Sequence, residues 1–321
     1  MEGTAPCEAK AGLSCRERVS EIVRMSNFGL SIKEETMKKI TQLFTAALLS
    51  LVIFTGAAHA KERVKLVYVE WAREVAITHV AGVLLEEMGY DVRISSVANA
   101  AMWASVAAGD SDAHLAAWLP MTHADLYARY KDQIVDLGPS YVDAKLGFVV
   151  PAYVTINSVT EMGANIDKFK GKIIGIDPGA GMSQAAEEAI AKNTSGLGKF
   201  QYVSGSDAIM VASLANAVKR KEWIVVPGWQ PHWMFGEWDL KILDDPDKIF
   251  GGAETINTIV RKGLDKDMPE VYAFFKNFDW KQLDLSSAMV DNKNGMEPAK
   301  SAEKFVKANR AKIDELLKAV K

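Results

Sequence analysis

The sequence predicts an α/β fold made of two similar lobes joined by two crossing strands. Short runs rich in β-branched residues alternate with helical segments, which is the pattern of a mainly parallel sheet covered by helices. The pattern occurs twice, and each copy ends in a Trp-Pro-His loop, at residues 118–123 and 229–232. The stretches ahead of these loops, at 95–102 and 204–210, also resemble each other. We therefore expect two half-molecules of common design, each ending a strand at a Trp.

The first 60 residues are predicted to lie outside this fold. Residues 37–60 have the three parts of a secretory signal peptide: a basic start at Met37-Lys38-Lys39, an apolar stretch at 43–55, and the cleavage site Ala58-His59-Ala60. The apolar stretch is shorter than the ~20 residues of a membrane span. Residues 1–36 precede this signal and are polar, which indicates a mis-called start. The alternative is a cytoplasmic extension ahead of an uncleaved anchor.

The composition excludes several classes of partner and site. The 38 Lys and Arg residues nearly balance the 41 Asp and Glu residues, and no basic stripe occurs, so nucleic acid is not an expected partner. Both cysteines, Cys7 and Cys15, lie ahead of the predicted cleavage point. An exported chain beginning at Lys61 would thus have no disulfide, thiol chemistry, thiolate metal site or lipid-bearing cysteine. We expect a freely soluble protein of a bacterial periplasm, monomeric and without a cofactor.

Lobe one is predicted to comprise residues 61–150 and 261–321. Its strands follow from β-branched runs and its helices from apolar spacing on one side, with Gly89 and Gly109 at helix ends. The expected strands cover 64–69, 91–97 and 114–118, and the expected helices cover 75–88 and 102–108. The tail from 268 to 321 has the spacing of amphipathic helices and is expected to pack on this lobe.

Lobe two is predicted to comprise residues 151–260 and to repeat the order of lobe one. The apolar run at 145–154 indicates a strand that crosses into it, and 254–261 indicates the strand that returns. The other expected strands cover 172–176, 200–203 and 223–226, and the expected helices cover 182–191 and 208–218. Two α/β lobes with a two-strand hinge form a clamshell, and ligands of such sheets lie at the carboxyl ends of the strands.

Three tryptophans are placed to meet between the lobes, because Trp71, Trp118 and Trp229 each come at the end of a predicted strand. Indole faces attract cations. A quaternary ammonium, which has no N–H to donate, is held by such faces at ~0.5–2 kcal/mol each. The alternative is that these side chains are core or interface anchors. Their equivalent positions favour an aromatic cage. The remaining tryptophans are expected to be structural: Trp103, Trp223, Trp233, Trp238 and Trp280.

A glycine-rich turn at 177–183 opens the first helix of lobe two. Its glycines allow the backbone to approach a ligand, and the N–H groups of a helix start favour anions. An ordinary strand-to-helix turn is the alternative. His123 and His232 could each donate a hydrogen bond to a carboxylate, or order their own loops instead. Together with the cage, these groups indicate a ligand with a cation at one end and a carboxylate at the other.

Several strings of this chain resemble glycine betaine-binding proteins of osmoprotectant ABC transporters. The resemblance extends over nearly all of residues 64–320 and is carried by Val69-Glu70-Trp71, Met102-Trp103, Ala117-Trp118-Leu119-Pro120-Met121-Thr122-His123, Gly175-Ile176-Asp177-Pro178-Gly179-Ala180-Gly181-Met182, Gly228-Trp229-Gln230-Pro231-His232-Trp233-Met234-Phe235 and Leu243-Asp244-Asp245-Pro246. It implies a periplasmic-binding-protein clamshell (type II-like), a small betaine ligand, and a membrane ABC permease that receives the ligand.

The resemblance also implies a role for individual residues. In that family a prism of Trp side chains holds the trimethylammonium group, while backbone amides and a His bind the carboxylate. Carried over to this chain, the set is Trp71, Trp118 and Trp229 for the prism, Gly181 and Met182 for the amides, and His123 for the carboxylate. Some members have the two halves in permuted order; here the half with Trp71 comes first.

Two positions depart from the pattern of the relatives. Ala72 stands where many relatives have Asp, and Arg73 stands where choline-specific relatives have an Asp. Choline has no carboxylate and would gain nothing from a nearby Arg, so Arg73 disfavours choline as the ligand. Proline betaine and dimethylsulfoniopropionate stay open beside glycine betaine, and carnitine or a choline-like compound are further alternatives.

An exported hydrolase is the alternative of another class. No Gly-x-Ser-x-Gly elbow occurs, and Ser183 after the glycine turn does not by itself make a catalytic triad. Metal-ligand spacing is also missing among the histidines His79, His114, His123 and His232. We therefore expect a binding protein and not an enzyme.

Overall fold

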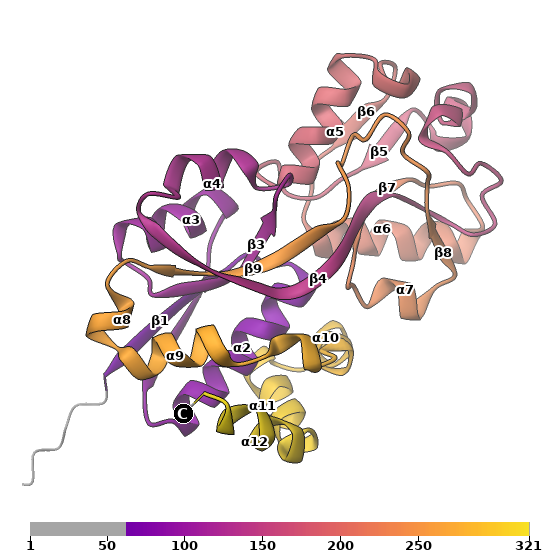
Figure 1. The fold of residues 1–321 in the computed structure, drawn as a ribbon. Helices are drawn as coiled ribbons and strands as arrows, with labels where there is room; N and C mark the ends of the chain where they lie inside the picture. The colour runs from indigo at the N-terminus through magenta and orange to yellow at the C-terminus, as the bar shows by residue number, and fades with distance from the viewer. Residues whose placement is uncertain (1–61, 321) are drawn as a thin grey trace, which may run out of the picture. The chain divides into compact units, whose positions relative to one another are not determined.

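The computed structural model describes residues 62–320, which form a mixed α/β structure with two groups of elements joined by two long strands (Figure 1). We call these groups lobe one and lobe two and define them by their elements below. The predicted extension 1–36, the predicted signal peptide 37–60 and both cysteines lie outside the described residues. Within residues 62–320, no helix is both long and apolar enough to cross a bilayer.

Lobe one begins with three strands and the helices between them. Its elements are β1 (Arg63–Tyr68), α2 (Ala72–Glu87), β2 (Asp91–Ser96), α3 (Asn99–Ala108), β3 (Ala113–Leu119) and α4 (Ala124–Tyr130). The strand β1 pairs in parallel with both β2 and β3. The predicted strands and helices are confirmed, although α2 and α3 each begin three residues early. The helix α4 was not expected. None of its residues is fully buried, and only Leu126, Tyr127 and Tyr130 pack partly buried against the core.

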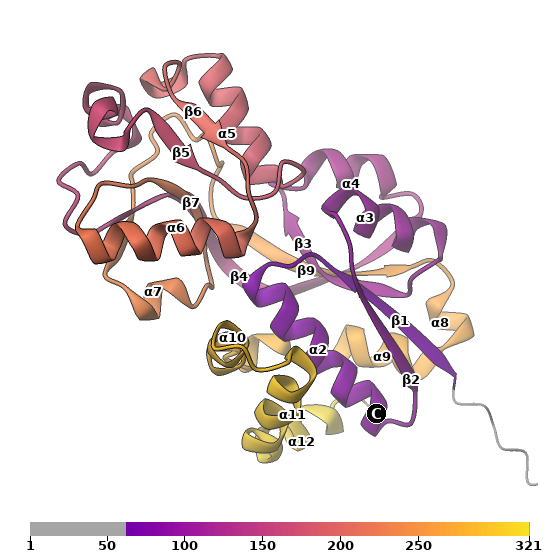
Figure 2. The same ribbon diagram turned by 180° about the vertical axis from the view of Figure 1, so that it is seen from behind.

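The C-terminal tail is helical and packs on lobe one, as predicted. Its elements are α8 (Leu264–Asp267), α9 (Pro269–Asn277), the 3₁₀ turn Trp280–Gln282, α10 (Ser286–Lys293), α11 (Pro298–Ala308) and α12 (Arg310–Lys318). Phe274 and Phe305 of the tail share one apolar core with Leu66 of β1 and Leu84 of α2. Seen from behind, α11 and α12 lie beside α2 (Figure 2). The tail thus covers the side of α2 that faces away from the sheet.

Lobe two has the second set of strands and helices. Its elements are the 3₁₀ turns Val159–Glu161, Gly163–Phe169 and Thr194–Gly196, with β5 (Lys172–Ile174), α5 (Gly181–Ala191), β6 (Gln201–Val203), α6 (Asp207–Arg220), β7 (Val226–Gln230), α7 (Met234–Glu237) and β8 (Leu240–Ile242). The strands β5 and β6 pair in parallel. The strand expected at 223–226 begins only at Val226 and continues through Trp229, because this later stretch is the one that pairs with a crossing strand.

The two lobes are connected by β4 (Ile134–Pro151) and β9 (Glu254–Arg261), which run side by side in Figure 1. The return strand β9 has the predicted bounds, whereas β4 is far longer than the expected 145–154. The main sheet has the order β2-β1-β3-β9-β4-β7, with β8 paired to β4. The expectation of a mainly parallel sheet is wrong, because β9 returns antiparallel to both β3 and β4.

The pairing of β4 changes along its length. Up to Ala144 it pairs with β9, and from Lys145 onward it pairs antiparallel with β7 and β8. This exchange of partners marks where the strand leaves lobe one and enters lobe two. The lobe boundaries predicted at 150/151 and 260/261 remain a prediction.

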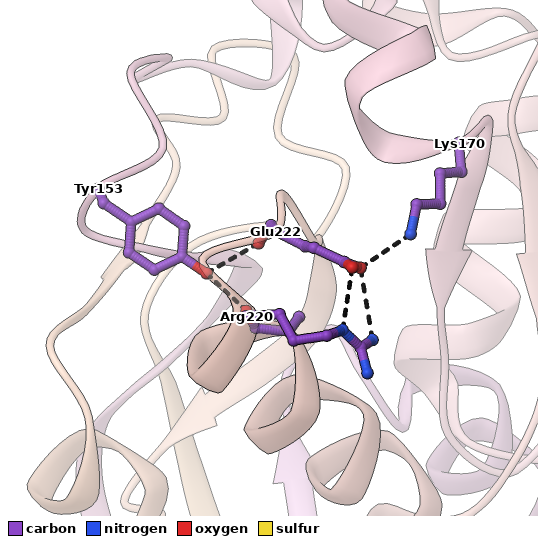
Figure 3. Close-up of polar contacts among 5 residues, drawn as sticks. Tyr153, Lys170, Arg220 and Glu222 are labelled. Atoms are coloured by element: carbon purple, nitrogen blue, oxygen red, sulfur yellow. Dashed lines mark hydrogen bonds and ion pairs between the residues drawn. The ribbon is translucent and has the colours of Figure 1, made fainter.

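The end of α6 in lobe two is tied to two neighbouring segments through Glu222 (Figure 3). Its carboxylate accepts hydrogen bonds from Lys170 Nζ at 2.8 Å and from Arg220 Nε at 2.9 Å, and the Lys170 ammonium helps to hold the pKa of the Glu222 carboxyl below its usual range. The Tyr153 hydroxyl donates to the carbonyl oxygens of Glu222 and Ala217. Exposed ion pairs add little stability, so the main effect of these contacts is to fix the position of α6.

Candidate functional site: an aromatic pocket between the lobes

Trp71, Trp118 and Trp229 line one pocket, as their positions at strand ends predicted. The other lining residues are Thr122, His123, Leu146, Ile176, Ala180, Gly181 and Met182. The empty space at this pocket, part of which is open to solvent, amounts to about 290 Å³. Among the described residues, the five other tryptophans do not contribute to this lining.

Each of the three indoles reaches the pocket from a different element. Trp71 is the N-cap residue of α2, three residues after β1 ends. Trp118 and Trp229 are each the second-last residue of a strand, β3 and β7. Trp118 was expected inside its strand, whereas Trp229 was expected just after one. Leu146 of β4 is paired with Trp229, which places this crossing strand at the pocket wall. The three indoles are only 3–5% exposed, so most of their surface is packed against the protein.

Carboxylates hold two of the three indole rings through their N–H groups. Trp118 Nε1 donates to Glu74 Oε1 at 3.0 Å, and Trp71 Nε1 donates to Asp177 Oδ2 at 3.0 Å. Trp229 Nε1 is buried without a hydrogen-bond partner among residues 62–320. Glu74 is fully buried, and this burial raises the pKa of its carboxyl despite the neighbouring Arg73. These bonds fix the orientation of two rings that line the pocket.

His123 presents a hydrogen-bond donor at the pocket. Its Nδ1 accepts the backbone N–H of Trp118 at 3.1 Å, so in the neutral ring the proton lies on Nε2. Burial lowers the pKa of His123 to about 3, which keeps the ring neutral near pH 7. Its Nε2 is buried and has no partner within the part of the chain that the structure describes. Trp103 packs edge-on against this ring at 5.8 Å and so supports it from behind.

The start of α5 faces the same pocket. Gly181 and Met182 are the first two residues of this helix, where backbone N–H groups have no partner inside the helix and the helix dipole is positive. Gly181 is packed tightly against lobe one, since a Cβ atom there would lie 2.0 Å from the carbonyl oxygen of Thr122. A glycine at this position therefore allows the helix start of lobe two to approach the loop of lobe one.

His232 does not join the other predicted residues at the pocket lining. Its Nε2 lies 3.1 Å from Asp207 Oδ1, and its Nδ1 accepts the backbone N–H of Met234 at 3.1 Å. Both contacts are with residues of lobe two. The ordering role left open by the sequence is therefore the one that the geometry favours.

Arg73 also points away from the pocket, so the argument that it disfavours choline loses its basis. The side chain is only 2% exposed and donates from one guanidinium nitrogen to Ser140 Oγ at 3.1 Å, in the crossing strand β4. Its guanidinium carbon lies 5.5 Å from the centre of the Tyr141 ring. Arg73 therefore braces α2 against a crossing strand.

Sequence reasoning did not find the residues that support the site from behind. Glu74 lies one helical turn after Trp71, but its partner Trp118 is 44 residues away. Glu254, at the start of β9, accepts hydrogen bonds from the N–H and the hydroxyl of Thr122 at 2.8 and 2.9 Å, and burial raises the pKa of its carboxyl. Only the spatial proximity of distant segments identifies these side chains.

The chain matches a known protein family over most of its length. Residues 62–308 match the family described as the substrate binding domain of ABC-type glycine betaine transport systems. The glycine betaine/carnitine transport binding protein GbuC of Listeria monocytogenes serotype 1/2a (strain 10403S) is 44% identical over 141 residues. This match covers 44% of the present chain and 47% of that relative, so the chain matches about half of the relative's length.

Solved structures match the fold more completely. The lactococcal protein OpuAC, in its closed conformation with glycine betaine, has 38% identity and a TM-score of 0.74, over 80% of this chain and 99% of that one. ProX, a glycine betaine and L-proline-binding protein of Borrelia burgdorferi, has 40% identity and a TM-score of 0.75, over 80% and 96%. A choline-binding protein in complex with choline has 27% identity and a TM-score of 0.75, over 80% and 91%. The predicted two-lobe clamshell is confirmed.

Proposed function

Because the chain belongs to the family of substrate-binding domains of ABC-type glycine betaine transport systems, we propose that it captures glycine betaine between its two lobes and delivers it to a membrane permease. Members of this family bind a solute for transport and are not enzymes, which removes the hydrolase alternative. They act outside the cytoplasm, in the periplasm or at the cell surface. For this chain we propose the periplasm, with a signal peptide cleaved after Ala60 and a monomeric mature protein.

The observation that carries the proposal is the presence of two opposite kinds of group around one pocket. Three indole faces offer the negative charge density that a quaternary ammonium needs. His123 Nε2 and the first N–H groups of α5 offer hydrogen bonds to a carboxylate. Glycine betaine has both charges a short distance apart, so one small molecule can reach both kinds of group around the pocket.

The two kinds of group are divided between the lobes, so neither lobe has a complete site. Trp71, Trp118 and His123 come from lobe one, whereas Trp229 and the start of α5 come from lobe two. A ligand that touches both sets binds the closed arrangement better than an open one. It therefore shifts the population toward closure, and the closed form is the one we expect a permease to recognise.

A carboxylate-bearing ligand fits this chain better than choline. Choline ends in a hydroxyl and would leave His123 Nε2–H and the helix start without an anionic partner. Proline betaine, dimethylsulfoniopropionate and carnitine carry both charges and remain candidates for the same site. The neutral donor His123 is thus the residue on which the choice between betaines and choline depends.

Calorimetry of residues 61–321 tests the proposal directly. We expect glycine betaine to bind more tightly than choline, and more tightly than unmethylated glycine, whose ammonium prefers hydrogen bonds to aromatic faces. Trp71→Ala, Trp118→Ala and Trp229→Ala should each weaken glycine betaine by ~10-fold or more. Trp280→Phe is the control, because Trp280 lies in the tail core and outside the pocket lining. Parent-like affinity in all three alanine variants would refute the aromatic cage.

N-terminal sequencing of the exported protein tests its processing. A mature chain that begins at Lys61 is expected, and one that begins at Met1 would contradict the proposed signal peptide.

A further inference from the structure

The start of helix α2 lies where the two lobes meet, and lobe two holds it. The N-cap residue Trp71 has an extended backbone and no side-chain cap bond of its own among the described residues. Instead, Asp207 of lobe two accepts the backbone N–H of Ala72 at 3.0 Å, through Oδ2. Asp177, also in lobe two, accepts the indole N–H of Trp71 at 3.0 Å. The helix that carries a cage indole is therefore capped from the opposite lobe.

Asp207 is oriented for this contact by its own lobe. It is the first residue of α6, whose start is capped by Ser206 Oγ. His232 Nδ1 accepts the N–H of Met234, so the neutral ring carries its proton on Nε2, which lies 3.1 Å from Asp207 Oδ1. Asp207 and His232 are 6% and 5% exposed. The carboxylate thus lies at the starts of two helices, α6 and α2, and next to the His232 ring.

We propose that Asp207, oriented by His232, is the residue through which lobe two captures the start of α2 as the lobes close. The inference rests on the proposed betaine site. Asp207 is outside the pocket lining and its partner is a backbone N–H, so the contact has the same strength whichever ligand is bound. It is a positioning residue, and it acts on the fraction of protein that is closed.

This role predicts an effect that a residue of the cage does not produce. The apparent dissociation constant equals the intrinsic one divided by the fraction of binding-competent protein. Loss of Asp207 lowers that fraction and therefore lowers the affinity for every ligand by one common factor. Loss of a cage indole instead weakens each ligand according to its own cationic group.

Two substitutions remove the contact from opposite sides. Asp207→Ala removes the acceptor. Ala72→Pro removes the donor N–H at the first position of α2, where proline is well tolerated, and the extended backbone of Trp71 is the one that a residue before proline prefers. Asp284→Ala is the matched control, because Asp284 accepts the N–H of Ser286 at the start of α10 within lobe one alone.

The variants are compared by calorimetry with each betaine that the parent binds, and by small-angle scattering with and without ligand. A hydrogen bond to a charged group corresponds to ~10- to 100-fold in affinity. We expect Asp207→Ala and Ala72→Pro each to lose affinity by a factor in this range, which is equal for all ligands. Both variants should also show a larger radius of gyration than the parent. The double variant should lose little more than either single one, and Asp284→Ala should bind like the parent.

Parent-like affinity in both variants would overturn the inference, and so would a loss that differs between ligands or fully additive losses in the double variant. If Asp207→Ala fails to fold, Ala72→Pro decides the question, because it changes only lobe one. A parent that binds no betaine would instead refute the proposed function, and the inference would fall with it.

Discussion

Replacing Trp118 and Trp229 by Phe, one at a time, separates the ligand contribution of an indole from its structural contribution. Both residues line the pocket and both are 3% exposed. The two residues differ in the hydrogen bonding of their indole N–H groups. Trp118 Nε1 donates to the buried Glu74, whereas Trp229 Nε1 has no partner among residues 62–320. The two substitutions remove the same atoms but only one of them breaks a hydrogen bond.

For the ligand, the two variants should behave alike. Phe keeps an aromatic face that attracts cations less strongly than an indole, so each substitution is expected to cost a fraction of the ~0.5–2 kcal/mol of a full cation–π contact. This corresponds to roughly a two- to ten-fold weaker affinity for glycine betaine.

For stability without ligand, the two variants should differ. Trp118→Phe leaves the Glu74 carboxylate buried without its indole donor, which costs ~1–3 kcal/mol more than the matched change at Trp229. Because burial already raises the pKa of Glu74, its protonation at low pH relieves part of this cost, and the gap between the variants should narrow as the pH falls. Urea unfolding of both variants at several pH values measures the gap. Equal stabilities at neutral pH would refute the assigned role of Glu74.

Three further outcomes are expected. His123→Ala should weaken glycine betaine by ~10-fold or more, as expected for the loss of a hydrogen bond to a charged group, while leaving any choline affinity nearly unchanged; calorimetry with both ligands checks this, and an equal loss for choline would contradict it. Gly181→Ala places a Cβ atom 2.0 Å from the Thr122 carbonyl oxygen, so scattering should find no compaction on adding ligand, whereas Gly179→Ala, which meets no atom within 4 Å, should compact normally. Burial lowers the pKa of both His114 and His123 to about 3 from an ordinary 6.5; the unfolded chain therefore binds more protons below pH 6.5, and the free energy of unfolding should fall as the pH drops from 6.5 toward 3. Replacing His114 should flatten that dependence in a denaturant titration, and an unchanged slope would show that its burial is not the cause.

Much of the fold could be predicted from local patterns. The strand β1, the helices α2 and α3 and the return strand β9 follow from β-branched runs and apolar spacing, which are properties of short segments. The long strand β4 could not be predicted in full, because its first half contains Gly138 and Pro139, residues that favour turns over strands. It forms a strand through pairing with β9, which lies more than 100 residues later in the chain.

The candidate site could also be predicted only in part from the sequence. The sequence by itself marked the three indoles, the glycine turn and His123 as candidates for the site, because each lies at or just after a strand end or at a helix start that a local pattern indicates. Their role in binding stays a prediction. Only the tertiary structure decided the hydrogen-bond partners around the site. Glu74 accepts the indole N–H of Trp118, Asp177 accepts that of Trp71, and Arg73 donates to Ser140 of β4. The structure also places His232 next to Asp207 and outside the pocket lining. The physical reason is that the partner of a side chain depends on which distant segments the sheet and the two lobes bring together. A pattern within a short segment carries no information about which distant segments meet.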